Sequence, residues 1–199
     1  MTPHLSEKIL PLKEQRFLLP GHHSWEQFEA IEALMAHVPA LRISYLDGWI
    51  EFITNSSEHE TIKTNLCSLL ETYLFNKGTS FIHQSRTNIR EKNKSVSFEI
   101  EESYDIGKKK ELPDIAIEVV MLRSNIDQLE KYKRFKIIEV WFWEDNQLSL
   151  HRLRDQKYEQ ISRSEFLPEL EIDLLTRCVR MPSRLEARTE FLQEIRRQR

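Results

Sequence analysis

The chain has 199 residues, of which 40% are hydrophobic and 31% are charged, and its formal net charge is −3 at pH 7. This length can bury the core of one domain, and the composition is typical of ordinary globular proteins. No apolar run approaches the roughly 20 residues of a membrane-spanning helix, and the net charge argues against a general polyanion-binding protein.

The N-terminus and the cysteines favour a reducing compartment. Met1–His4 does not resemble the start of a secretory signal. Cys67 and Cys178 provide neither metal-ligand spacing nor a disulfide framework. We therefore expect a cytoplasmic protein without a membrane partner. We expect one domain over residues 1–199, with a core at about 24–175 and a helical tail at about 176–199.

The first predicted elements are a helix and a hairpin. Ser24 and Gln27 fit a capping box, and the following apolar residues keep helical spacing to about His37. Residues 41–46 and 49–54 alternate in polarity around an Asp-Gly pair. That pattern predicts two antiparallel strands joined by a tight turn.

A long second helix is predicted over residues 57–77. Ser57 and Glu60 have the spacing of another capping box, and Gly78 can adopt the left-handed conformation that ends a helix. Within this start, Glu60 would complete the cap. A histidine at the start of a helix, such as His59, is more often a surface residue.

Beyond Gly78 the pattern predicts a sheet. Polarity alternates from residue 81 to 89 and continues into an acidic hairpin. Residues 126–135 have the pattern of a helix, and residues 137–143 form an apolar run typical of a strand covered on both faces. Residues 148–153 and 158–161 predict two more strands before C-terminal helices. The predicted fold class is α/β, with a mixed, mainly antiparallel sheet flanked by helices.

Glu101 and Glu118 are the most informative residues of the acidic hairpin. If residues 107–110 form its turn, the turn centre lies midway between them, so they face each other across two antiparallel strands. Alternation then assigns the neighbouring residues to two faces. Glu99, Ser103, Asp105, Asp114 and Ala116 share the face of the pair, and Ile100, Tyr104, Ile106, Ile115, Ile117 and Val119 take the other.

Two like charges at this position need an explanation, because they destabilise a sheet when they lie directly opposite each other. A hard divalent cation bound by carboxylate oxygens would compensate them. A solvent-facing acidic edge is the alternative. If the carboxylates are close and no metal is bound, we expect each to raise the pKa of the other.

Several segments together resemble a known family. They are His59, Glu101-Glu102-Ser103-Tyr104, Pro113-Asp114-Ile115-Ala116-Ile117-Glu118-Val119, Asp127-Gln128-Leu129-Glu130-Lys131-Tyr132 and Glu139-Val140-Trp141. Over roughly residues 24–175 the chain resembles the Uma-two family of restriction endonucleases, which is abundant in cyanobacteria. That family belongs to the PD-(D/E)XK nuclease superfamily. The resemblance implies a restriction-endonuclease-like core and a Mg²⁺- or Mn²⁺-dependent endonuclease with DNA as its partner, and a homodimer is compatible with it.

The resemblance also implies roles for individual residues. Glu101 stands where the family has its first Asp, and Glu118 matches the family Glu, so both would bind the metal. A nearby lysine would orient or deprotonate the attacking water. The family lysine aligns with Gln128, and Lys131, three positions further on, would take its place. His59, Glu60 and Asp114 would lie behind the metal-binding carboxylates and support them.

Two departures from the family pattern leave an alternative open. Ile100-Glu101 replaces the usual Pro-Asp, and the extra methylene could shift a metal by about 1 Å, an error that can cost on the order of a hundredfold in rate. Gln128 cannot supply a positive charge. We expect Gln128 and Lys131 at the margin of their helix, from which the Lys131 ammonium reaches the pair. The alternative is a degraded nuclease fold that binds nucleic acid or protein.

Overall fold

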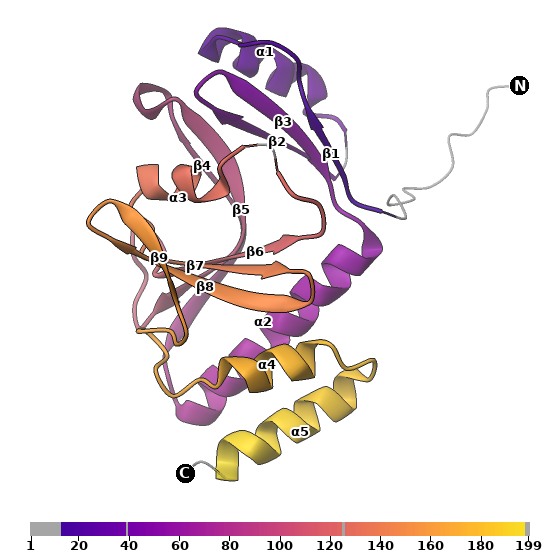
Figure 1. Ribbon diagram of the computed structural model, residues 1–199, viewed down its shortest axis with the longest axis vertical. Coiled ribbons are helices and arrows are strands. Elements are labelled where there is room, and N and C mark those ends of the chain that lie inside the picture. The colour runs from indigo at the N-terminus through magenta and orange to yellow at the C-terminus, as the bar shows by residue number, and fades with distance from the viewer. Residues whose placement is uncertain (1–12, 39, 125, 198–199) are drawn as a thin grey trace, which may run out of the picture.

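The fold places one twisted sheet between helices (Figure 1). The computed structural model describes residues 13–38, 40–124 and 126–197. The residues used to argue against a secretory signal, Met1–His4, lie outside this description. No described helix is both long and apolar enough to span a membrane.

The helices and strands follow the predicted order. The helices are α1 (Trp25–Met35), α2 (Ser57–Lys77), α3 (Gln128–Arg134), α4 (Ile172–Val179) and α5 (Arg184–Arg197), with a short 3-10 helix at Lys92–Lys94. The strands are β1 (Gln15–Leu18), β2 (Leu41–Leu46), β3 (Trp49–Thr54), β4 (Phe81–Glu91), β5 (Val96–Ile106), β6 (Ile115–Val120), β7 (Glu139–Glu144), β8 (Gln147–Arg154) and β9 (Lys157–Ile161). The sequence pattern predicted neither strand β1 nor the short 3-10 helix.

All of these strands join one sheet in the order β1-β3-β2-β5-β6-β7-β8-β9, and β4 pairs with β5 beside this path. Strands β6 and β7 pair in parallel, and the other described pairings are antiparallel. The predicted fold class is therefore confirmed: a mixed, mainly antiparallel sheet with flanking helices, consistent with a restriction-endonuclease-like fold.

Two hydrophobic clusters cover the central strands. Helices α2, α4 and α5 pack together against one face, where Trp141 and Trp143 of β7 are buried. In Figure 1, α4 and α5 lie side by side next to α2. Helix α3 covers the other face, where Tyr132 packs near Phe98 and Phe142. The C-terminal helices contribute Phe191 and other buried residues to the first cluster.

The start of α2 differs from the prediction by one residue. Ser56, not Ser57, is the N-cap, and its hydroxyl accepts a hydrogen bond from the backbone N of His59 at 3.1 Å. Glu60 therefore does not complete a capping box. The end of α2 is as predicted, since Gly78 has φ +67° and closes the helix in the left-handed conformation.

Strand β5 breaks the simple alternation at Glu101. Ile100 packs in the cluster beneath α3, whereas Tyr104 packs in the opposite cluster. The prediction that these two residues share a face is wrong. The ladder between β4 and β5 is interrupted between Arg86, which has φ 52°, and Glu101. On its other side, β5 pairs with β2 before Glu101 and with β6 after it. The two halves of β5 therefore belong to different parts of the sheet.

Candidate active site

Glu101 of β5 and Glu118 of β6 form a buried pair of carboxylates. The β5–β6 ladder pairs Glu102 with Ile117, and continuing this register places Glu101 opposite Glu118, as predicted. The backbone N of Val119 donates a hydrogen bond to Glu101 Oε2 at 2.9 Å. The backbone N of Glu101 donates to Glu118 Oε1 at 3.4 Å. Because the two residues are only 1% and 6% exposed, a solvent-facing acidic edge is the wrong interpretation.

Arg42 of β2 places a positive charge between the two carboxylates. Its Nη2 lies 2.5 Å from Glu101 Oε1, and its Nη1 lies 3.8 Å from Glu118 Oε2. Burial opposes the ionised guanidinium, but the charges of Glu101 and Glu118 outweigh burial and raise the pKa of Arg42 above its usual value. An arginine thus stands at the position where the sequence predicted a metal ion.

His59 connects the pair to a third carboxylate. It is fully buried, with Nε2 3.0 Å from Glu101 Oε1 and Nδ1 2.8 Å from Glu14 Oε2. Burial disfavours the imidazolium, but the contacts with Glu101 and Glu14 raise the pKa of His59 to about 9. The structure therefore contradicts the interpretation of His59 as a surface residue, because the first turn of α2 directs its ring at β5.

A second ionic group continues from Glu14. Arg16 Nε lies 2.8 Å from Glu14 Oε1, and Arg16 Nη1 lies 3.4 Å from Glu51 Oε2. Glu51 Oε1 also accepts a hydrogen bond from Ser124 Oγ at 2.8 Å. Together with Lys131, the buried array contains four acidic and four basic side chains. These are Glu14, Glu51, Glu101 and Glu118, and Arg16, Arg42, His59 and Lys131. Opposite charges in equal number allow such burial, since isolated buried charges are very costly.

The protons are shared unequally within the pair. Burial and then the charge of Glu101 raise the pKa of Glu118 to about 7. Burial also opposes ionisation of Glu101, but Arg42 and His59 outweigh it and lower the pKa of Glu101 to about 2. The expectation that the pair raises pKa values is confirmed for Glu118, whereas at Glu101 the contacts with Arg42 and His59 outweigh the raising effects. The Tyr132 hydroxyl also donates a hydrogen bond to Glu118 Oε1.

The structure places Lys131 and Gln128 beside Glu118. All three residues line a small cavity of about 10 Å³, which is room for about one water molecule. Lys131 belongs to α3 and is only 4% exposed, with its side chain on the buried face of the helix. The prediction that it lies at the margin of the helix is therefore wrong. Burial lowers the pKa of Lys131 to about 8, although the charges of Glu118 and Glu51 partly oppose this shift. The lysine reaches the site because α3 packs on β5 and its Tyr132 binds Glu118 of β6.

Two of the other predicted residues have separate partners. Glu60 Oε1 accepts a hydrogen bond from Asn55 Nδ2 at 2.9 Å, and Glu60 Oε2 lies 2.8 Å from Lys63 Nζ. Asp114 Oδ2 accepts a hydrogen bond from the backbone N of Ile106 at 2.8 Å, and Lys110 Nζ also contacts it. Asp114 therefore stabilises the segment that connects β5 and β6. The described contacts do not place either residue against Glu101 or Glu118.

The donor set of the pair is suited to a hard divalent cation. Both carboxylates are buried side by side, and Glu101 Oε1 is contacted by Arg42 Nη2 at 2.5 Å and by His59 Nε2 at 3.0 Å. Carboxylate oxygens are the ligands that Mg²⁺ and Mn²⁺ prefer. Glu101 and Glu118 could hold such an ion, provided that the Arg42 guanidinium moves away from between them.

Comparison with known proteins connects this site with a family. The family model Uma2, described as "Putative restriction endonuclease", matches residues 25–181. This match contains Arg42, His59, both carboxylates and Lys131, whereas Glu14 and Arg16 precede it. No curated protein matches the chain at a significant level.

Proposed function

We propose, because the chain belongs to the Uma2 family and carries a buried acidic pair, that it is a metal-dependent endonuclease hydrolysing DNA phosphodiester bonds. The family description supports nuclease activity. The metal requirement and the DNA substrate are our proposal. One observation carries it: Glu101 and Glu118 lie together on adjacent strands as a buried pair of carboxylates.

In this proposal Glu101 and Glu118 hold Mg²⁺ or Mn²⁺. When bound, such an ion would lower the pKa of a water ligand and neutralise charge on the phosphate. Glu118 must lose its proton before it can act as a ligand, and its pKa of about 7 makes this feasible near neutral pH. The Tyr132 hydroxyl then orients the Glu118 carboxylate through their hydrogen bond.

Lys131 is the candidate for moving the proton of the attacking water. Because the pKa of Lys131 is about 8, part of the Lys131 population is neutral near neutral pH. In the neutral form Nζ can accept a proton. The ammonium that results would lie near the negative phosphate. Gln128 lines the same cavity and offers an amide N–H to a phosphate oxygen.

His59 and Arg42 have positioning roles in the proposal. His59 bridges Glu101 and Glu14, which fixes the orientation of the Glu101 carboxylate. Arg42 keeps the two carboxylates together by its charge. Its guanidinium would also be able to bind two phosphate oxygens of a substrate at once.

A plasmid assay tests the proposal. Supercoiled DNA is incubated with the purified protein and Mg²⁺ or Mn²⁺, with a chelator in a parallel reaction. We expect nicking that needs the metal and is lost in Glu118→Gln, which keeps the shape of the side chain but removes its charge. Cleavage that Glu118→Gln retains would come from another site or from a contaminant.

The second candidate is a nuclease fold that binds DNA or protein without cutting. The position of Arg42 favours it, because an internal cation already neutralises the pair. In this case the protein would bind DNA with equal affinity with and without divalent metal, and no condition would produce nicks. A homodimer and a cytoplasmic location stay predictions, the first of them testable by light scattering.

A further inference from the structure

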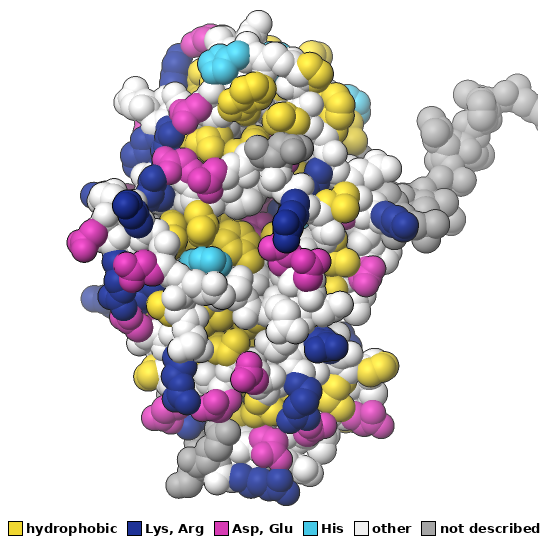
Figure 2. Space-filling view, in the orientation of Figure 1, with side chains coloured by type: hydrophobic (Ala, Val, Ile, Leu, Met, Phe, Trp, Pro, Cys, Tyr) yellow, Lys and Arg dark blue, Asp and Glu magenta, His cyan; other side chains and the backbone are white. Residues whose placement is uncertain are grey.

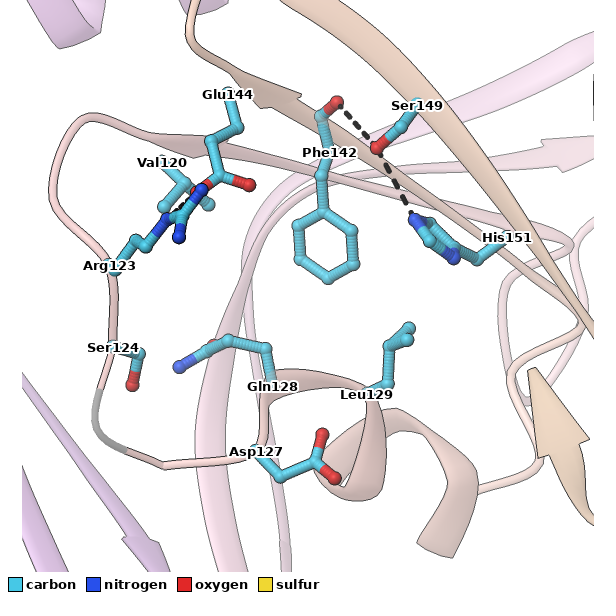
Figure 3. A pocket seen from close by; sticks show the side chains of 10 residues that line it. All are labelled: Val120, Arg123, Ser124, Asp127, Gln128, Leu129, Phe142, Glu144, Ser149 and His151. Atoms are coloured by element: carbon cyan, nitrogen blue, oxygen red, sulfur yellow. Dashed lines mark hydrogen bonds and ion pairs between the residues drawn. The ribbon is translucent and has the colours of Figure 1, made fainter. Parts of the chain in front are cut away.

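A cavity of about 330 Å³ opens on the same side of the sheet as α3, between that helix and strands β6 to β8 (Figure 3). This volume lies at the lower end of the range of about 300–1,000 Å³ that is usual for small-molecule sites. Figure 2 shows a hollow near the middle of this face, with hydrophobic side chains and a histidine inside it and charged side chains around it.

The floor of the cavity is aromatic and apolar. Figure 3 shows the Phe142 ring pointing from β7 into the cavity, towards Leu129 and Gln128 of α3. Phe142 is only 8% exposed, and its ring meets His151 edge-on at 5.6 Å between centroids. The part of this ring that lines the cavity offers an edge-on or offset aromatic contact to another planar group.

The walls supply both donors and acceptors of hydrogen bonds. Gln128 contributes an amide and Asp127 a carboxylate, while Ser149 Oγ and His151 Nε2 lie 3.3 Å apart on β8. At the rim, Arg123 Nε donates a hydrogen bond to Glu144 at 3.0 Å. Because the two acids outweigh the one arginine, the lining suits a neutral planar group with a polar edge better than a phosphate.

The cavity lies next to the acidic pair. Phe142 is the register partner of Glu118 on the adjacent parallel strand, so their backbones lie about 4.8 Å apart. Tyr132 contacts both, since its hydroxyl binds Glu118 and its ring packs edge-on against Phe142. Gln128 lines this cavity and also the small cavity at Glu118. A group bound here would lie one strand away from the proposed reaction.

We propose that this cavity binds one unpaired nucleobase next to the phosphate on which the acidic pair acts. The inference rests on the proposed nuclease function and adds a substrate class to it. A base inside a duplex is stacked and paired, so it must leave the helix before it can enter a cavity. The preferred substrates are therefore single-stranded, bulged or mismatched DNA.

The test measures binding rather than cleavage, so that it does not depend on activity. The Glu118→Gln protein is titrated with oligonucleotides of one sequence as a single strand, as a bulged duplex and as a perfect duplex. A series of single strands in which one abasic site is moved along the sequence follows. We expect single-stranded and bulged DNA to bind more tightly than duplex, and one or two abasic positions to weaken binding by about tenfold, as is usual for a stacked base.

Two substitutions at Ser149 connect this effect to the cavity. Ser149→Phe fills the cavity and should remove the effect of the abasic site, whereas Ser149→Ala removes the hydroxyl but keeps the space and should retain it. If Ser149→Phe leaves the abasic effect intact, or if abasic sites have equal effects at every position, the proposal is overturned. Circular dichroism and thermal unfolding show whether each variant is folded, and an unfolded Ser149→Phe is replaced by Ser149→Leu.

The outcomes separate this inference from the proposed function. A position-dependent abasic effect without cleavage by the wild-type protein keeps the cavity assignment and removes the nuclease. Metal-dependent cleavage with a flat abasic profile does the reverse. A free deoxynucleoside monophosphate is the control for the source of the base. If it binds saturably in a manner blocked by Ser149→Phe while abasic sites have no effect, the cavity belongs to a free nucleotide and the inference about DNA fails.

Discussion

Glu118 and Glu139 are both buried carboxylates, and they lie on the adjacent parallel strands β6 and β7. Their surroundings differ sharply. Glu139 accepts hydrogen bonds from four groups. These are Trp141 Nε1 at 3.1 Å, Arg152 Nη1 at 3.0 Å, Ser164 Oγ at 2.7 Å and the backbone N of Glu165 at 2.8 Å.

Glu118 instead faces another carboxylate. The pKa of Glu118 is raised to about 7 by burial and by the charge of Glu101, whereas Arg42 and His59 keep Glu101 ionised. A carboxylate that is saturated with donors stabilises the fold, whereas a close pair of buried carboxylates with pKa values shifted apart is an arrangement expected of a functional site. This difference predicts that the two glutamates respond to mutation in opposite ways.

The largest effect should come from Glu118→Gln. Loss of a metal-binding carboxylate should reduce metal-dependent cleavage by more than about a hundredfold, because even residues behind a ligand cost 10- to 100-fold. The free energy of unfolding should change little, because the lost repulsion from Glu101 and the lower cost of burying a neutral amide offset the lost attraction to Arg42 and Lys131. Initial rates of plasmid nicking and a urea denaturation curve measure the two quantities. A stable but fully active variant would contradict the comparison.

Lys131→Met should have the next largest effect. Methionine keeps the buried methylene volume, so folding is preserved, while the loss of the amine should reduce cleavage by about a hundredfold, within the range of proton-transfer catalysis. Gln128→Lys is the complementary change and should raise activity, because it restores the charge of the family pattern. If cleavage is indifferent to Lys131 and gains nothing from Gln128→Lys, the degraded-site interpretation replaces the nuclease.

Glu139→Gln should act on stability alone. The amide cannot accept all the hydrogen bonds of the carboxylate, and Arg152 loses the charge of its partner, so the free energy of unfolding should fall by about 2 kcal/mol. Affinity for Mn²⁺ should not change. Urea denaturation and a metal titration of the same preparation check both statements. A variant that keeps its stability but loses metal affinity would reverse the proposed roles of the two glutamates.

Arg42→Met should give the smallest effect and the most specific one. If the guanidinium competes with the metal for Glu101 and Glu118, its removal should tighten Mn²⁺ binding by about tenfold, which corresponds to about 1.4 kcal/mol. Arg42→Lys keeps a charge and should change affinity less. Weaker metal binding in Arg42→Met would mean that Arg42 organises the pair instead of competing for it.

The comparison also explains how much the sequence could predict. The register of Glu101 and Glu118 follows from local spacing around one connection, and the order of the main elements follows from periodicity and caps. Arg42 occupies an alternating strand in which a polar residue normally faces solvent, so nothing local marks it as buried. Its burial arises because β2 lies next to β5, a pairing between segments far apart in the sequence.

The sequence pattern did not predict the burial of His59, the contact of Glu14 with it, or the change of faces in β5, and the reasons are related. Ser57 and Glu60 have the spacing of a capping box although Ser56 is the N-cap. From the sequence, the start of α2, including His59, is therefore interpreted as an exposed helix terminus. Glu14 lies just before a strand of four residues, too short for a periodic signal. The change of faces at Glu101 depends on the neighbours of β5 on both sides. A buried ionic array is a tertiary property, and a single sequence does not reveal which charges meet.

The most direct test of the central claim is a calorimetric titration of the wild-type protein with Mn²⁺ at pH 6 and pH 8. The proton and the metal compete for Glu118, whose pKa is about 7, so the ionised fraction and the metal affinity both rise with pH. We predict affinity about tenfold higher at pH 8 than at pH 6 and no binding in Glu118→Gln. Absence of binding at both pH values, or binding that Glu118→Gln leaves unchanged, would contradict the claim that Glu101 and Glu118 form a metal site.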